Sequence, residues 1–283
     1  MHKSVEGTWR SRELIVYFAL AYGLSALLWL PLIARSHAPR FAFSVGTFGP
    51  TLAALISQRA YAGNWRAFRL WTSTRQVALG TAWGTSLVLF SSFAAALFMT
   101  RSGFNRWQWS SLLGLLIFFG PNLIGGPLGE EPGWRGYALP RLQQRFGPGR
   151  ASLLLGFLWA NWHLPLIAAH IYNVTWWQFV LVTTAASVLL TFACNISQGS
   201  VVCAILVHGV YNIATGIILN DFIGKATLYS NRVQHNVYWM AYCGVAAALW
   251  LATRGRLGLK RDQGTYVSDS ALKSASSESQ ATT

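Results

Sequence analysis

The stretch ASLLLGFLWANWHLPLIAAH, residues 151–170, opens a long uncharged part of the chain. From Ala151 to Asn220 the sequence contains no Asp, Glu, Lys or Arg. Apolar runs of about 18 or more residues also recur before and after this part, and runs of that length are typical of helices that cross a bilayer. The sequence therefore predicts an all-α, polytopic membrane protein.

The overall composition supports this prediction. Of the 283 residues, 53% are hydrophobic and 11% are charged, whereas soluble domains have about 25% charged residues. The net charge of +14 could suggest a nucleic-acid partner. However, the basic residues lie between apolar runs, where they act as topology signals and contact lipid headgroups. We therefore expect a lipid bilayer as partner and no nucleic acid.

The apolar runs predict about eight transmembrane helices. They cover approximately residues 14–34, 41–57, 77–99, 112–128, 151–169, 179–193, 201–219 and 237–252. The second run is short and interrupted by Gly49-Pro50. The first run lacks a small-residue cleavage site, so we expect it to remain as a span. Residues 1–261 then form one membrane domain, and 262–283, rich in Ser, Ala, Gln and Thr, form a disordered cytoplasmic tail.

The distribution of basic residues orients the spans. With a cytoplasmic N-terminus, 16 Lys and Arg residues lie in inside segments and 6 lie in outside loops. Cytoplasmic loops carry the excess of basic residues in membrane proteins. The sequence thus predicts a cell-membrane protein with both termini in the cytoplasm. The three cysteines, Cys194, Cys203 and Cys243, lie in or beside apolar runs without paired spacing, so we expect buried thiols.

Two adjacent carboxylates interrupt the apolar middle of the chain. Between Glu13 and Asp221 the only acidic residues are Glu130 and Glu131. A carboxylate in an apolar setting is costly and is commonly functional. Once removed from water it also becomes a better proton acceptor near neutral pH. We interpret the pair as the acid/base centre of an enzyme embedded in the membrane, although a solvated loop pair is the simpler reading.

Polar residues in three later positions belong with this pair. His163 lies in span five, and His208 and Asn212 share one face of span seven because they are four residues apart. Helical rise places both histidines at mid-membrane to inner-leaflet depth. Glu131 and Arg135 have the spacing of a favourable ion pair. The alternatives are a packed histidine at 163 and an interhelical hydrogen-bonding pair at 208 and 212.

Span four should end near the cytoplasmic surface, away from the histidines. The glycines and prolines at 120–121, 125–127 and 129 are expected to break the helix and turn the acidic pair inward. Irregular backbone at depth must be covered by protein or line a wet cavity. Pro132 suits the first turn of a helix that begins just after the pair, which would put both carboxylates near a helix N-terminus.

Together these motifs resemble the CPBP family of intramembrane proteases, also called the CAAX-protease, bacteriocin-processing or Abi family. They are Glu130-Glu131-x-x-x-Arg135, Trp159-x-x-x-His163 and His208-x-x-x-Asn212. The resemblance covers about residues 112–219, and the run from 130 to 142 is similar to the bacterial branch. The second motif is commonly written with Phe, and Trp159 stands in its place here.

The resemblance implies a fold of eight helices around a polar intramembrane cavity open to the cytoplasm. It implies that Glu130 and His163 activate a water molecule, and that Glu131 and Arg135 form a supporting ion pair. His208 and Asn212 would bind the oxyanion. The implied function is an intramembrane endopeptidase that cuts near the cytoplasmic leaflet, and a prenylated CaaX-like tail is the substrate precedent.

The use of a metal is left open by the sequence. Glu130, His163 and His208 are a plausible ligand set for a divalent metal such as zinc. The single-helix motif HExxH is absent, and the family has been described both as metalloproteases and as glutamate proteases.

Two other functions fit the same residues. The chain could be a non-catalytic scaffold or immunity-type protein that binds a peptide or partner in the same cavity. It could also be a proton-coupled transporter, because buried Glu and His relay protons; the absence of a sequence repeat counts against that reading. Outside the motifs, His170 is expected at the membrane interface. The Arg59–Arg75 loop is either an amphipathic surface segment or an ordinary basic loop.

Overall fold

The computed structural model describes residues 2–35, 40–66, 68–99, 117, 119–172, 174–215 and 228–259. Within these ranges all regular secondary structure is helical. The predicted all-α class is therefore confirmed. The expected disordered tail, 262–283, and parts of spans four and seven lie outside the described residues.

Three described helices are long and apolar enough to cross a membrane. Their apolar windows are Arg12–Ile33, Thr74–Leu97 and Trp176–Ile196, with mean hydropathies of 1.9, 1.4 and 2.0. They belong to α1 (His2–Ile33), α3 (Thr74–Met99) and α8 (Trp176–Ile196). Shorter apolar stretches lie in α9 (Val201–Ile213) and α11 (Leu228–Ala252). The chain is a multi-pass membrane protein.

The second predicted span is two consecutive helices. A 3₁₀ helix, η1 (Arg40–Phe48), is followed by α2 (Gly49–Ala62). Pro50 is in the first turn of α2, where a missing N–H costs nothing and a fixed φ favours the helix. α2 ends at Gly63, which adopts a left-handed conformation with φ 70°. The predicted interruption at Gly49-Pro50 is the start of this helix.

The chain around the acidic pair departs from the prediction. Residues 119–125 are helical, Gly126 is a turn, and α5 (Pro127–Glu131) then begins with Pro127 in its first turn. A helical segment does begin at Pro132, but the chain is already helical before it, because Pro127 opens α5. Pro132 opens a π-helical segment, η3 (Pro132–Ala138). Proline has no N–H for an i→i−4 bond, which favours a wider turn here.

Span five is also longer and more broken than predicted. α6 runs from Leu139 to Trp162 with a kink at Gly147, where φ is 74°. The short helix α7 (Leu164–Ala168) follows. His163 lies between the two helices as the C-cap of one and the N-cap of the other. Pro165 explains the break, because it has no N–H to continue the hydrogen bonds of α6 and lies in the first turn of α7, where that N–H is not needed.

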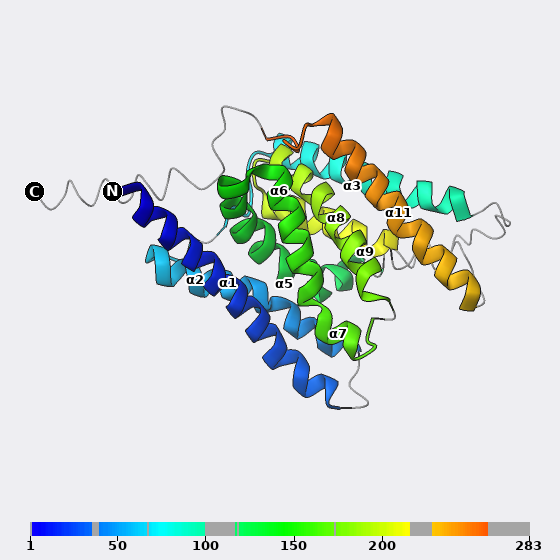
Figure 1. Ribbon diagram of the computed structural model, residues 1–283, viewed down its shortest axis with the longest axis horizontal. Helices are drawn as coiled ribbons and strands as arrows, with labels where there is room; N and C mark the ends of the chain where they lie inside the picture. The colour runs from blue at the N-terminus through cyan, green and yellow to red at the C-terminus, as the bar shows by residue number, and fades with distance from the viewer. Residues whose placement is uncertain are drawn as a thin grey trace, which may run out of the picture.

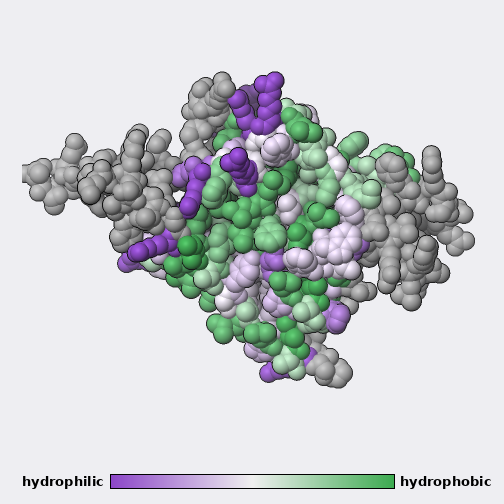
Figure 2. Space-filling view, in the orientation of Figure 1, coloured by the Kyte–Doolittle hydropathy of each residue, from purple (hydrophilic) through white to green (hydrophobic). Residues whose placement is uncertain are grey.

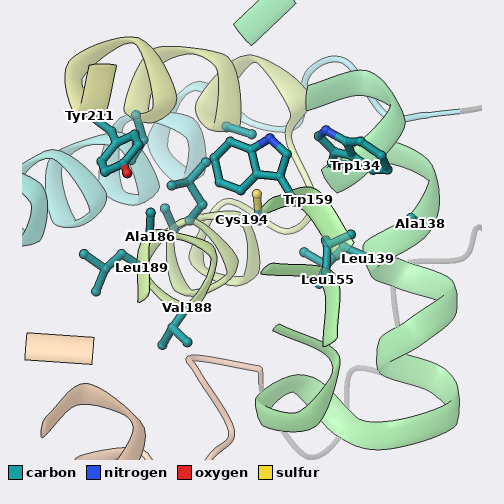
Figure 3. Packing of buried hydrophobic residues seen from close by; sticks show 14 of the residues in the cluster. Trp134, Ala138, Leu139, Leu155, Trp159, Ala186, Val188, Leu189, Cys194 and Tyr211 are labelled. Carbon is teal, nitrogen blue, oxygen red and sulfur yellow. The ribbon is translucent and has the colours of Figure 1, made fainter. Parts of the chain in front are cut away.

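Helix α8 is at the centre of the bundle. It packs against α3, α6, α9 and α11, while α1 packs against α2 and η1. Figure 1 shows α1 and α2 side by side at one flank, α6 in the middle, and α3 and α11 crossing at the opposite flank. In Figure 3, Leu155 and Trp159 of α6 belong to the same apolar cluster as Leu189 and Cys194 of α8.

The surface of this bundle is largely apolar. Figure 2 shows a broad hydrophobic face, with most of the strongly hydrophilic side chains toward its margins. Large apolar side chains such as Leu27, Phe90 and Leu251 are exposed. Such a surface suits contact with lipid. Glu13 of α1 accepts hydrogen bonds from Tyr137 and Arg141, so Arg141 is an ion-pair partner and more than a topology charge.

Candidate functional site

The acidic pair is buried inside the bundle. Glu130 and Glu131 are 4% and 0% exposed. Both lie in α5, whose neighbours include η1, α2, α9 and η3. The reading of a solvated loop pair is therefore wrong.

Two glycines allow this close approach. A Cβ on Gly129 would lie 2.7 Å from the backbone of Thr47, and one on Gly133 would lie 2.4 Å from the backbone of Pro50. Thr51 Oγ1 also donates to the Gly129 carbonyl at 2.6 Å. Only glycine fits where backbones approach this closely. The glycines and prolines near the pair thus bring it against α2, and the broken backbone is covered by protein as required at depth.

Glu131 is the acceptor in a buried charge network. Its Oε1 accepts from Arg135 Nη1 at 2.7 Å and lies 2.7 Å from His208 Nδ1. The predicted ion pair between Glu131 and Arg135 is therefore present. His208 was expected beside Asn212 as an oxyanion ligand. Its Nδ1 instead contacts Glu131, which leaves Nε2 as the ring nitrogen available to a ligand.

Glu130 has a different set of neighbours. Its Oε2 accepts a hydrogen bond from Trp159 Nε1 at 2.6 Å. A Cβ built on Gly126 would lie 3.2 Å from Glu130 Oε1 and 3.7 Å from Asn212 Nδ2. The second carboxylate oxygen and the Asn212 amide therefore flank the same space beside Gly126. This places the first and third motifs next to each other.

His163 is held by backbone and aromatic contacts. Its Nδ1 is 2.9 Å from the Trp159 carbonyl. Because a carbonyl only accepts, Nδ1 carries the proton, and Nε2 has the lone pair in the neutral ring. The ring packs against Trp162, Phe179 and Tyr172 at centroid distances of 4.6, 5.0 and 5.7 Å. Among the described residues no hydrogen bond joins His163 to Glu130.

Trp159 connects the parts of the site, a role that sequence reasoning missed. Besides its bond to Glu130, its ring lies 4.3 Å from the Arg135 guanidinium carbon and 5.0 Å from the His208 ring in an edge-to-face arrangement. The available signal was its place four residues before His163 on one helix face. Its contact with Glu130 depends on how α6 packs against α5, which spacing does not reveal.

Two further predictions concern His170 and a metal centre. His170 is exposed, in a left-handed conformation with φ 55°, and makes no part of the site. In the described part of the chain no three His, Cys, Asp or Glu side chains are grouped to hold a metal ion. The donors as arranged thus do not form a metal centre from Glu130, His163 and His208.

The comparisons with known proteins cover this same region. A family model described as Type II CAAX prenyl endopeptidase Rce1-like matches residues 112–214. That range contains all three motifs, Trp159 included. The chain carries an Rce1-like segment. The resemblance drawn from the motifs is therefore confirmed, and its bacterial branch stays a prediction.

A curated relative supports the Rce1-like assignment. The CAAX prenyl protease 2 of Methanococcus maripaludis is 36% identical over 93 residues, which cover 30% of this chain and 34% of that protein. The chain thus spans about a third of the length of the curated relative it matches.

Proposed function

We propose that this chain is an intramembrane endopeptidase of the CAAX-protease type. The observation that carries the proposal is the buried Glu130, whose free oxygen faces the same space as the Asn212 amide. A buried base beside a fixed amide donor is the arrangement that water-mediated acyl hydrolysis requires. The Rce1-like match over residues 112–214 supports this reading.

In the proposed reaction Glu130 is the general base. It removes a proton from a water molecule while the water oxygen bonds to the carbonyl carbon of the scissile peptide. The carbonyl π electrons move to oxygen and form a tetrahedral oxyanion. The intermediate then breaks its C–N bond, and the proton held by Glu130 passes to the leaving amine. The products are a carboxylic acid and an amine.

The other polar residues have supporting roles in this proposal. Asn212 donates to the oxyanion, and His208 does so through Nε2 when its ring is protonated at both nitrogens, because Nδ1 already donates to Glu131. Fixed donors of this kind are worth about 3 kcal/mol each. Arg135 and Glu131 fix the His208 ring through Nδ1. His163 offers its unprotonated Nε2 as a second acceptor for the water. No step is routed through a metal, because the described donors are not grouped around one.

The substrate is proposed from the curated relative. The Methanococcus maripaludis protein is named a CAAX prenyl protease, and we infer a peptide or protein with a lipid-modified tail as substrate here. We also propose that the protein lies in the cell membrane with both termini in the cytoplasm, a proposal supported by the apolar surface and the distribution of basic residues. The cut would then lie near the cytoplasmic leaflet.

The test is peptide cleavage by purified protein in liposomes. The probe is a fluorogenic peptide with a farnesylated CaaX tail, and its unmodified form tests the need for the lipid. Wild type is expected to cleave, while Glu130→Ala and His163→Ala are expected to lose activity by at least about 100-fold. His170→Ala is the matched control, since this histidine is exposed and outside the site.

Equal cleavage by Glu130→Ala and wild type would overturn the proposal. If no preparation cleaves, but the wild type binds the peptide and Glu130→Ala does not, the chain is a binding scaffold instead.

A further inference from the structure

The two carboxylate oxygens of Glu130 have unequal surroundings. Oε2 is bonded to Trp159 Nε1 at 2.6 Å. Oε1 faces the space beside Gly126, where Asn212 Nδ2 is the other polar atom. A free carboxylate rotates and exchanges its oxygens, whereas one short charge-assisted bond fixes which oxygen faces the space.

The donor on Oε2 is itself held in place. Trp159 is 2% exposed, and the Arg135 guanidinium lies over its ring at 4.3 Å. A cation over an indole face is attracted to the ring, and Arg135 is fixed by Glu131 at 2.7 Å. The ion pair formed by the second glutamate therefore holds the indole that orients the first.

The space beside Oε1 exists because residue 126 is glycine. A methyl group there would lie 3.2 Å from Oε1, which is tighter than an ordinary contact, and 3.7 Å from Asn212 Nδ2, which is an ordinary contact. The backbone at Gly126 has φ −161° and ψ −73°, which is neither extended nor helical. The feature of Gly126 that bears on the site is the open space beside two polar atoms, Glu130 Oε1 and Asn212 Nδ2.

We infer that Trp159 and Gly126 assign separate roles to the two oxygens of Glu130. Trp159 is a positioning residue that occupies Oε2, and Gly126 keeps open the position of the attacking water between Oε1 and the Asn212 amide. The inference rests on the proposed hydrolase function. It adds two residues to that function: Gly126, which lies outside the three motifs, and Trp159, the aromatic residue of the second motif. It also names Oε1 as the atom that takes the proton.

The first test fills the water position. Gly126→Ala is expected to lower kcat by at least about 100-fold, because the methyl group displaces the water from the general base. Binding of the farnesylated peptide and the thermal unfolding temperature are expected to stay close to wild type. Gly120→Ala is the matched control, because a Cβ at Gly120 meets nothing within 4 Å. Wild-type turnover by Gly126→Ala would overturn the inference.

The second test removes only the N–H donor. Trp159→Phe keeps an aromatic ring under Arg135 but leaves Oε2 free. It is expected to lower kcat by about 10- to 100-fold, the range for one hydrogen bond to a charged group, with KM unchanged. Trp134→Phe is the control, because Trp134 is equally buried and its Nε1 has no hydrogen-bond partner in the described part of the chain. A purely structural role would instead lower the unfolding temperature and the folded fraction without this kcat effect.

A third readout does not depend on activity. In protein labelled with ¹⁵N-tryptophan, the Trp159 indole N–H resonance is identified by its loss in Trp159→Phe. It is expected to shift in Glu130→Gln and to stay in place in His170→Ala. An unmoved resonance in Glu130→Gln would overturn the contact on which the inference depends.

The outcomes separate the inference from the proposed function. If cleavage depends on Glu130 while Trp159→Phe and Gly126→Ala turn over like wild type, the inference is wrong and the function stands. If the resonance shifts but no preparation cleaves any peptide, the function is overturned. The roles assigned to the two Glu130 oxygens are then overturned as well, although the contact between Trp159 and Glu130 is retained.

Discussion

At the scale of single residues, Oε1 of Glu131 is the acceptor that the charged groups of the buried site share. Glu131 Oε1 contacts both Arg135 and His208. Glu131 Oε2 and the Arg135 Nε and Nη2 atoms have no hydrogen-bond partner among the described residues. Buried polar atoms of this kind are commonly bonded to internal water. The ion pair between Glu131 and Arg135 is therefore sensitive to the loss of either residue.

Arg135→Gln is expected to destabilise the fold strongly. It leaves the Glu131 carboxylate buried without its ion-pair partner, which costs about 3–5 kcal/mol. The measurement is the free energy of unfolding in mixed detergent micelles. Arg150→Gln, at an exposed position in the first half of α6, is the control and is expected to change stability by about 0.5 kcal/mol or less. Equal stabilities of the two variants would show that the ion pair is not needed.

At the scale of elements, the start of α9 is held by a distant segment. Val201 and Val202 donate backbone N–H bonds to the carbonyls of Arg69 and Leu70 at 3.0 and 3.1 Å. The first N–H groups of a helix lack partners within the helix, so this segment satisfies them. The Arg59–Arg75 loop thus supports the helix that carries His208 and Asn212, a structural role in addition to any contact with lipid.

Ser200→Ala tests this attachment. Ser200 Oγ donates to the Leu70 carbonyl and accepts from the Cys203 N–H. Losing this N-cap is expected to cost about 1 kcal/mol in the free energy of unfolding. Hydrogen exchange of the first turn of α9 should rise as well. Ser86→Ala, at an exposed position of α3, should change neither quantity, and equal exchange in both variants would contradict the capping role.

Gly133→Ala tests the approach of η3 to α2. The added Cβ would lie 2.4 Å from the Pro50 backbone, so the two elements must separate. Overpacking of this kind costs about 1–3 kcal/mol, and activity should fall because η3 carries Arg135. Gly23→Ala in α1 is the control, because its Cβ meets nothing within 4 Å. A Gly133→Ala protein as stable as the Gly23→Ala protein would contradict the close packing.

At the scale of the whole molecule, the length of the apolar runs predicted the membrane helices reliably. The runs around α1, α3 and α8 predicted membrane helices because each window is long and almost uncharged. The spacing of Glu131 and Arg135 predicted their ion pair, since i,i+4 neighbours meet on any helix. The burial of the acidic pair also followed from its cost in an apolar chain.

Contacts between different helices could not be predicted from apolar length or residue spacing. The bond from Trp159 to Glu130 and the contact of His208 with Glu131 depend on how α6 and α9 pack against α5. The start of α5 was misplaced because the segment offers two prolines, Pro127 and Pro132, that suit a first turn. Only the non-helical backbone of Gly126 before Pro127 decides between them.

The orientation of the whole chain is a further prediction. The excess of basic residues predicts that both termini lie in the cytoplasm. Epitope tags fused at each end should be protected from protease in intact spheroplasts and become digested after permeabilisation. Digestion of one tag in intact spheroplasts would show an odd number of spans and contradict the predicted topology.

The most direct test of the central claim is hydrolysis in H₂¹⁸O. Wild-type protein in liposomes, given the farnesylated CaaX probe peptide, is expected to release a product with one ¹⁸O in its new carboxylate. The near-isosteric Glu130→Gln variant is expected to release none above background, because the amide accepts no proton from water. Labelled product formed by Glu130→Gln at the wild-type rate would contradict the assignment of Glu130 as the base.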